Sequence, residues 1–198
     1  MKEWNDIWEN FDDINWFGRR FKKEQKKALE KVLGKIHLPR NPKILDVGCG
    51  SGYTLSFFRQ LGYKNSIGVD KSPKTLKVCK RLFNFIEKKD VFNKDILKDK
   101  IGKFDLIFSD GLLEHYKPMT SLVKGMCSIS NKWILLFQPN QTSFFSRIKY
   151  RFGSKQWEKE YFYTKEDYIK EFKKFGFKLE YDGNLNFNEE MILLFKRG

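Results

Sequence analysis

The amino-acid sequence predicts an α/β fold in which a doubly wound, mostly parallel sheet is flanked by helices. An apolar run at residues 44–47 is followed at once by a glycine-rich turn and then by a helical stretch that reaches about residue 61. A second apolar run, at 66–70, is again followed by a helical stretch, here to about residue 85. Because a helix returns the chain to the same edge of the sheet, strands that alternate with helices pair in parallel.

The remaining elements extend this pattern to seven strands. Ser72 and Pro73 suit the N-cap and the first position of the second helix. Thr164 and Asp167 approximate a capping box at the start of a helix that ends at Gly176. The last two strands are expected to pair as an antiparallel hairpin. Further strands are predicted at 91–96, 104–108, 132–137, 177–181 and 191–196, and further helices at 19–36 and 118–129.

The chain of 198 residues carries a formal net charge of +14, from 39 basic and 25 acidic residues. Such an excess of positive charge favours association with RNA, DNA or an anionic membrane surface. The densest positive region is 19–43, with ten basic and two acidic residues. Lys is far commoner than Arg, and Phe, Asn and Ile are abundant, which equally suits a coding sequence rich in A and T. The charge is therefore either a nucleic-acid-binding face at 19–43 or a compositional bias.

Three cysteines, Cys49, Cys79 and Cys127, stand far apart, without a C-x-x-C pair or a histidine cluster. This pattern indicates reduced thiols in a cytoplasmic protein and argues against structural zinc, so we assign no metal ligands. The start of the chain does not have the pattern of a signal peptide. The longest strongly apolar runs, such as 133–137, are too short to cross a bilayer. We expect a cytoplasmic protein without a transmembrane segment.

The first turn contains Gly48, Gly50 and Gly52 and follows Asp46. Glycine lets the backbone turn sharply with positive φ and lets a ligand lie against the main chain. The N–H groups at the start of the next helix then face that ligand. A dinucleotide fingerprint would need its third glycine where this chain has Tyr53. The turn therefore indicates a nucleotide-like ligand other than a dinucleotide.

Residues 46–52, Asp-Val-Gly-Cys-Gly-Ser-Gly, resemble the first motif of the class I, or Rossmann-like, S-adenosylmethionine-dependent methyltransferases. The block 103–116, a buried strand followed by Leu-Glu-His, resembles the fourth motif of the small-molecule type of that family. The resemblance covers 40–137 by motif and 161–198 by topology. It implies a three-layer sandwich around a seven-stranded, doubly wound sheet with a reversed last strand. It also implies an enzyme of the EC 2.1.1 class that uses S-adenosyl-L-methionine and releases S-adenosyl-L-homocysteine.

The resemblance assigns cofactor-binding roles position by position. The three glycines let the donor approach, and Asp46 orients the turn or meets the amino-acid end of the donor. Asp70, at the end of the second strand, accepts the ribose hydroxyls. Asp95 accepts the adenine amino group, with Asp90 as the alternative in a shifted register. The expected cofactor-binding residues are Asp46, Gly48, Cys49, Gly50, Gly52, Asp70, Lys71, Asp95, Ile96, Ser109 and Gly111.

Methyl transfer from a sulfonium is an in-line displacement, so an enzyme mainly has to align the methyl carbon with the nucleophile and the leaving sulfur. An acceptor that is already ionised needs no general base, whereas an alcohol does. His115 is the candidate base, because imidazole titrates near neutrality. A purely structural His115 is the alternative.

Two segments outside the motifs each allow more than one functional interpretation. We divide the chain into a helical extension or lid, 1–40, and a donor-binding domain, 41–198. The extension carries an apolar stripe at helical spacing, either core packing or an aromatic lid over the donor. Aromatic and basic residues of 141–160 could stack on a ring or base, sit in a membrane interface through 141–157, or simply cover the sheet. The stripe consists of Trp4, Ile7, Trp8 and Phe11.

The expected acceptor is a small molecule, amphiphilic or anionic in kind, or a lipid. The sequence lacks the Asn/Asp-Pro-Pro-Tyr/Phe tetrad of enzymes that methylate the amino groups of nucleic acids. It also lacks the Pro-Cys nucleophile of cytosine C5 enzymes. The alternatives are an RNA-directed methyltransferase, or a catalytically silent fold that binds nucleic acid or a protein through 19–43.

Overall fold

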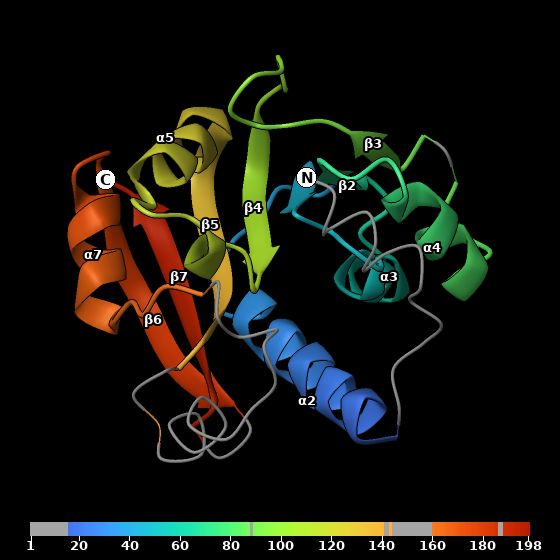
Figure 1. Ribbon diagram of the computed structural model, residues 1–198, viewed down its shortest axis with the longest axis horizontal. Helices are drawn as coiled ribbons and strands as arrows, with labels where there is room; N and C mark the ends of the chain where they lie inside the picture. Colours follow the sequence, from blue (N-terminus) through green and yellow to red (C-terminus); the bar gives the residue numbers. More distant parts are fainter. Residues whose placement is uncertain (1–15, 88, 141–142, 144–159, 186–187) are drawn as a thin grey trace.

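The structure, a computed structural model, describes residues 16–87, 89–140, 143, 160–185 and 188–198. These residues form one seven-stranded sheet in the order β3-β2-β1-β4-β5-β7-β6, with helices on both of its faces (Figure 1). The strands are β1 (Ile44–Val47), β2 (Ser66–Asp70), β3 (Val91–Asn93), β4 (Phe104–Asp110), β5 (Ser130–Pro139), β6 (Phe177–Leu185) and β7 (Glu190–Arg197). The helices are α2 (Trp16–Leu33), α3 (Tyr53–Gln60), α4 (Thr75–Leu82), the short 3-10 helix η1 (Leu113–His115), α5 (Thr120–Ile129) and α7 (Lys165–Lys173).

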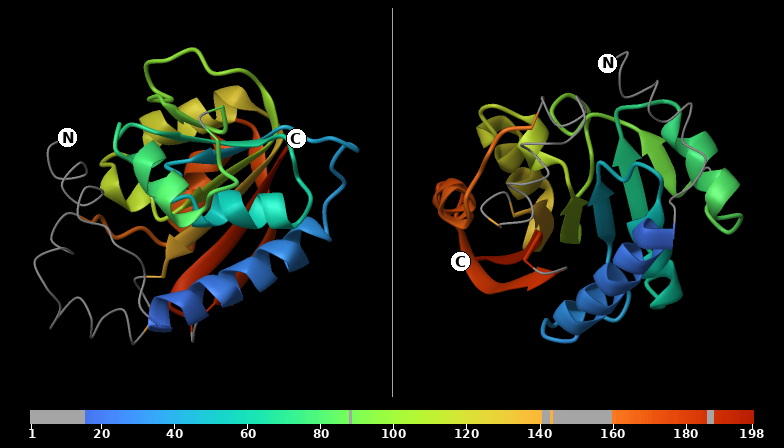
Figure 2. Two further views of the ribbon diagram at one scale, coloured as in Figure 1. Left: turned by 90° about the vertical axis from the view of Figure 1, so that its right-hand side faces the viewer. Right: turned by 60° about the horizontal axis from the view of Figure 1, so that its bottom comes forward.

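The three-layer sandwich predicted from the sequence is confirmed. Side chains alternate between the faces of the sheet, so Leu45 and Ile107 face one core while Ile44 and Leu106 face the other. The first core is completed by α5 and α7, and the second by α2 and α3. A third, smaller cluster holds α4 beside α3. Figure 2 shows these layers from two further directions.

The parallel half of the sheet fixes which residues share an edge. In β1, Asp46 pairs with Gly68 of β2 on one side and with Phe108 of β4 on the other. All three strands run in the same direction, so their carboxyl ends lie together. The acids that end β2 and β4, Asp70 and Asp110, therefore lie at the same edge as Asp46.

The reversed last strand is also confirmed. β7 runs antiparallel to both β5 and β6, and Pro139 at the end of β5 pairs with Glu190 at the start of β7. Both strands of this hairpin are longer than the sequence predicts, because the pairing continues to Leu185 and Glu190. As a result, Glu190 reaches the edge at which the parallel strands end.

Three predicted helix starts are shifted in the structure, and the first of them is that of α2, which begins at Trp16 and not at 19. Ser72 is not the N-cap of α4: its N–H donates to Asp70 at 2.8 Å, and its hydroxyl accepts the N–H of Lys74, in the turn that precedes the helix. The helix begins at Thr75, with Lys74 as its N-cap. The helix predicted from 118 begins at Thr120. Both α4 and α2 also end earlier than predicted, at Leu82 and at Leu33 before Gly34.

The third strand is shorter than predicted. β3 ends at Asn93, and Asp95 lies in the turn that follows. There the Asp95 carboxylate accepts the N–H of Leu97 at 2.9 Å, which stabilises a turn rather than an extended strand. By contrast, the predicted capping box of α7 is confirmed: Thr164 accepts the N–H of Asp167, and Asp167 accepts the N–H of Thr164.

Several predictions concern residues that the structure does not describe. The apolar stripe at Trp4, Ile7, Trp8 and Phe11 and nearly all of 141–159 are among them. The boundary between 1–40 and 41–198 stays a prediction. Within the described part of the chain, no helix is both long and apolar enough to span a membrane.

Asp90, the alternative adenine-binding acid, has a structural role. Its side chain is 6% exposed and forms an ion pair with Arg59 of α3, and it accepts the N–H of Glu87 at 2.9 Å. Arg59 also donates to the carbonyl groups of Lys64 and Ser66. This ion pair ties α3 to the segments that flank β2 and β3.

We predict that Arg59→Met lowers the free energy of unfolding by about 3 kcal/mol, because it leaves the Asp90 carboxylate buried without its cation. Urea denaturation measures this loss. The double variant Arg59→Met, Asp90→Asn should recover part of it, since the uncompensated charge is gone. Equal stability of Arg59→Met and the wild type would contradict the prediction.

Candidate active site

A cavity of about 240 Å³ lies at the carboxyl ends of β1, β2 and β4. The turn after β1 forms its floor, and residues after β2, β3 and β4 form its walls. In doubly wound sheets ligands bind at this edge, where the strand order reverses. The predicted site residues that line the cavity are Asp46, Gly48, Cys49, Gly50, Asp70, Lys71, Asp95, Ile96, Gly111 and His115.

The glycines of the first turn have two different functions. Gly48 has φ of 72°, and a Cβ there would lie 3.1 Å from a methyl group of Leu112, which also lines the cavity. Gly50 also has a positive φ, of 48°. Gly52 does not line the cavity: a Cβ there would lie 2.8 Å from Cys79 Sγ. Gly52 therefore allows α3 and α4 to pack closely, while Gly48 and Gly50 shape the floor.

Asp70 supports the turn from the end of β2. Its carboxylate accepts the N–H of Gly50 at 3.1 Å and that of Ser72 at 2.8 Å. Burial raises the pKa of Asp70, although these two hydrogen bonds act in the opposite direction. The carboxylate thus holds the turn in place and borders the cavity.

Asp46 is the most deeply buried acid of the cavity, at 2% exposure. Burial raises its pKa well above the ordinary range, the charges of Asp110 and Asp70 add to the rise, and Lys22 opposes it. Its Oδ2 atom has no hydrogen-bond partner among the described residues. A buried polar atom without a partner is costly, so Asp46 is suited to receive a donor group from a ligand.

The cavity is also lined by Lys71, Asp95 and Ile96. The Lys71 ammonium lies over the ring of Tyr116, 5.3 Å from its centre, and so links the end of β2 to the segment after η1. Ser109, by contrast, is fully buried and does not line the cavity. Its hydroxyl donates to the Val47 carbonyl at 2.9 Å and holds β4 against β1.

His115 lines the cavity from η1, beside Glu114. Glu114 Oε1 lies 3.9 Å from His115 Nε2. Glu114 is 3% exposed, and burial raises its pKa to about 8, with Glu160 and Asp110 adding to the rise. The structure thus brings His115 to the cavity together with a buried carboxyl group that the sequence did not reveal.

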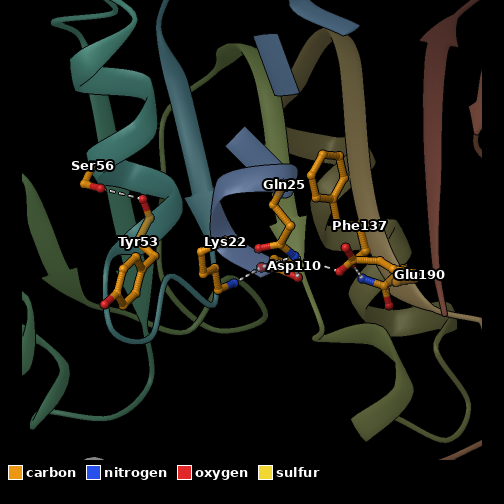
Figure 3. A network of polar contacts seen from close by, with 8 residues as sticks. Lys22, Gln25, Tyr53, Ser56, Asp110, Phe137 and Glu190 are labelled. Atoms are coloured by element: carbon orange, nitrogen blue, oxygen red, sulfur yellow. Dashed lines mark hydrogen bonds and ion pairs between the residues drawn. The ribbon is translucent and has the colours of Figure 1, made fainter. Parts of the chain in front are cut away.

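A polar network on the α2 side was not predicted (Figure 3). Lys22 Nζ lies 2.8 Å from Asp110 Oδ2, and both residues line the cavity. Gln25 Nε2 donates to Glu190 Oε1 at 2.8 Å and to Asp110. Lys22 and Gln25 are three residues apart and so share a helix face, but their partners in β4 and β7 are distant in the sequence.

This network also sets the protonation of Glu190. Burial raises the pKa of Glu190 well above its ordinary value, and the neighbouring Asp110 adds to the rise both by its charge and by accepting a hydrogen bond from the protonated form. The pKa of Lys22 is raised too: burial would lower it, but the charge of Asp110 and the hydrogen bond to it outweigh burial.

A family model described as a methyltransferase domain matches residues 17–181. The chain belongs to this family. It is a class I, Rossmann-like methyltransferase domain of the S-adenosylmethionine-dependent kind. The match begins within α2, so it includes the helix that carries Lys22 and Gln25.

Two curated relatives are tRNA U34 carboxymethyltransferases. That of Cellvibrio japonicus is 34% identical over 101 residues, covering 48% of this chain and 31% of the relative. That of Psychromonas ingrahamii is 35% identical over 88 residues, covering 41% and 26%. The methyltransferase domain described here thus spans less than a third of these relatives.

A crystal structure of magnesium protoporphyrin IX methyltransferase from Synechocystis, with bound S-adenosyl-L-homocysteine, has a similar fold. Its TM-score is 0.70 at 17% identity, and the alignment covers 98% of this chain and 94% of that one.

The cavity fits S-adenosylmethionine as the ligand. Leu112 lies close to Gly48, so a side chain at position 48 would fill the space between them. Asp70 offers carboxylate oxygens at the rim, and Asp46 offers a buried oxygen that lacks a partner among the described residues. A nucleoside with hydroxyl groups and an ammonium group would satisfy these acceptors.

We predict that Glu190→Gln stabilises the protein increasingly as the pH rises above about 4.5. The wild type keeps Glu190 protonated in the folded state. Its contribution to stability is therefore full below the pKa of the unfolded chain and is lost as the pH rises through the folded pKa. The difference between the variant and the wild type should grow by up to about 1.4 kcal/mol per pH unit.

Urea denaturation at several pH values measures this difference. Glu180→Gln is the matched control, because Glu180 is exposed on β6 and its removal should give no such trend. A difference that is independent of pH for Glu190→Gln would show that Glu190 is ionised in the folded protein.

Proposed function

We propose that this domain transfers a methyl group from S-adenosylmethionine to a small acceptor, amphiphilic or anionic in kind. The observation that carries the proposal is an ion pair that lines the cavity on the α2 side. Lys22 and Asp110 both line the cavity and form an ion pair with each other. The acceptor would then fit between this ion pair and the side chains of His115 and Tyr116, a space suited to a small molecule.

The donor would be held by the residues at the carboxyl ends of the first two strands. Asp70 would accept the ribose hydroxyls, and Asp95 with Ile96 would border the adenine. Gly48 and Gly50 would let the donor lie against the backbone, and Asp46 would meet the amino-acid end. When bound, the sulfonium supplies an activated methyl group.

The chain's own contribution to the reaction is mainly alignment. The cavity walls around Gly111, His115 and Tyr116 would orient the acceptor toward the donor, which is the largest part of catalysis in such a displacement. If the acceptor is an alcohol, His115 is placed at the cavity to take its proton. An acceptor that is already ionised would need no base.

A second candidate is an RNA-directed methyltransferase. Two observations favour it: the curated relatives modify tRNA, and Lys23, Lys27 and Lys31 are exposed along α2. Exposed lysines on one helix suit phosphate contacts. A catalytically silent domain is disfavoured, because the glycine turn and the acids around it form an intact cavity.

We predict that Asp70→Ala weakens binding of S-adenosylmethionine at least about tenfold, because it removes hydrogen-bond acceptors from a partly buried cavity. Isothermal titration calorimetry measures the dissociation constant. Asp182→Ala is the control, since Asp182 is exposed on β6 and pairs only with Lys165 among the described residues. An unchanged dissociation constant for Asp70→Ala would refute the proposed donor site.

To identify the acceptor, the protein would be incubated with S-adenosylmethionine labelled in its methyl group and with fractionated cell extract. We predict that the label enters a small metabolite or lipid and that Asp70→Ala reduces this transfer. Label in a nuclease-sensitive polymer would instead support the RNA-directed function. Absence of transfer to every fraction would count against both.

A further inference from the structure

Three side chains beside the cavity each carry an atom that could bind a metal ion, and these atoms lie close together. The residues are Glu114 and His115 of η1 and Glu160, which precedes α7 in the chain. One ligand atom from each, a carboxylate oxygen or an imidazole nitrogen, lies within 4.8 Å of both others. His115 also lines the cavity, so the cluster borders the proposed acceptor end.

The backbone holds these three residues together. The N–H of Tyr161 donates to the carbonyl of Glu114 at 2.7 Å. The hydroxyl of Tyr163 donates to the carbonyl of Tyr116 at 2.7 Å. These two hydrogen bonds fasten the segment that begins at Glu160 alongside η1. The side chains are therefore brought together by the fold and not by a chance contact of long, exposed groups.

Glu114 supplies an independent indication of a ligand. Its side chain is 4% exposed, yet its Oε2 has no hydrogen-bond partner among the described residues. Its Oε1 is 3.9 Å from His115 Nε2, which is too long for a hydrogen bond. A buried carboxylate oxygen without a partner carries a desolvation cost that a cation would offset.

We propose that Glu114, His115 and Glu160 bind a divalent metal ion. Two carboxylates and one imidazole suit a first-row divalent ion such as Mn²⁺. Mg²⁺ is less favoured, because it prefers oxygen ligands throughout. Three protein ligands leave coordination positions for water or a substrate. This proposal differs from the sequence analysis, which assigned no metal ligands because the cysteines are scattered and the histidines form no cluster.

We also assign the ion a role in methyl transfer. This part of the inference rests on the proposed function. The acceptor end carries the carboxyl groups of Asp110, Glu114 and Glu160, and a carboxylate that is ionised there would repel an anionic acceptor. A divalent ion reverses the local charge and can hold an acceptor oxygen beside the cavity. An ion-bound hydroxyl would release its proton to water, its oxygen would bond to the methyl carbon, and the carbon–sulfur bond would break. His115 would then be a metal ligand and not the base.

The test is a titration of the full chain with Mn²⁺. The electron paramagnetic resonance signal of the free ion measures how much Mn²⁺ remains unbound. We expect one site per chain. Glu160→Gln and Glu114→Gln should each weaken binding at least about tenfold, in line with the loss of one ligand from three. Glu166→Gln, an exposed acid at the start of α7, should leave it unchanged.

Glu160 is partly exposed, so Glu160→Gln should fold even if Glu114→Gln does not; circular dichroism checks both. Equal Mn²⁺ affinity of the wild type and Glu160→Gln would overturn the proposal, as would the absence of binding by the wild type. This titration needs neither donor nor acceptor. A protein that binds Mn²⁺ but transfers no methyl group would refute the proposed function alone, and methyl transfer without Mn²⁺ binding would refute the metal site alone.

Discussion

The parallel register of β2, β1 and β4 is the constraint on which the site depends. Because these strands run in the same direction with aligned ends, Asp70, Asp46 and Asp110 meet at one edge. Three carboxyl groups this close would repel one another and lose hydration. The fold offsets part of that cost with backbone N–H groups at Asp70 and with the Lys22 ammonium at Asp110.

This arrangement makes α2 a structural part of the cavity. Its apolar face packs on the sheet through Leu29 and Val32, and its polar residues Lys22 and Gln25 reach the edge where the strands end (Figure 3). One helix thus contributes both to the core and to the electrostatics of the site. A displacement of α2 would expose the cavity and would also leave Asp110 and Glu190 without their partners.

The same constraint gives the two ends of the cavity different chemistry. The donor end consists of a glycine turn and the acids beside it, of which Asp70 accepts the N–H of Gly50. The acceptor end combines Lys22, His115 and several carboxyl groups, two of which have raised pKa values because they are buried. A carboxylate that is ionised at the acceptor end would repel an anionic acceptor, and a divalent ion bound by Glu114, His115 and Glu160 would offset that repulsion.

The sequence by itself determined the family, the seven strands, the glycine turn and the acid at the end of β2, because these depend on local periodicity and on motifs within a few residues. Ten of its predicted site residues lie together at the cavity. Only the tertiary structure assigned Gly52 and Ser109 to packing, ended β3 before Asp95, and joined Gln25 to Glu190 and Glu160 to Glu114. These contacts join residues far apart in the chain. Their partners are set by how the hairpin and the helices pack, which no local pattern in the sequence encodes.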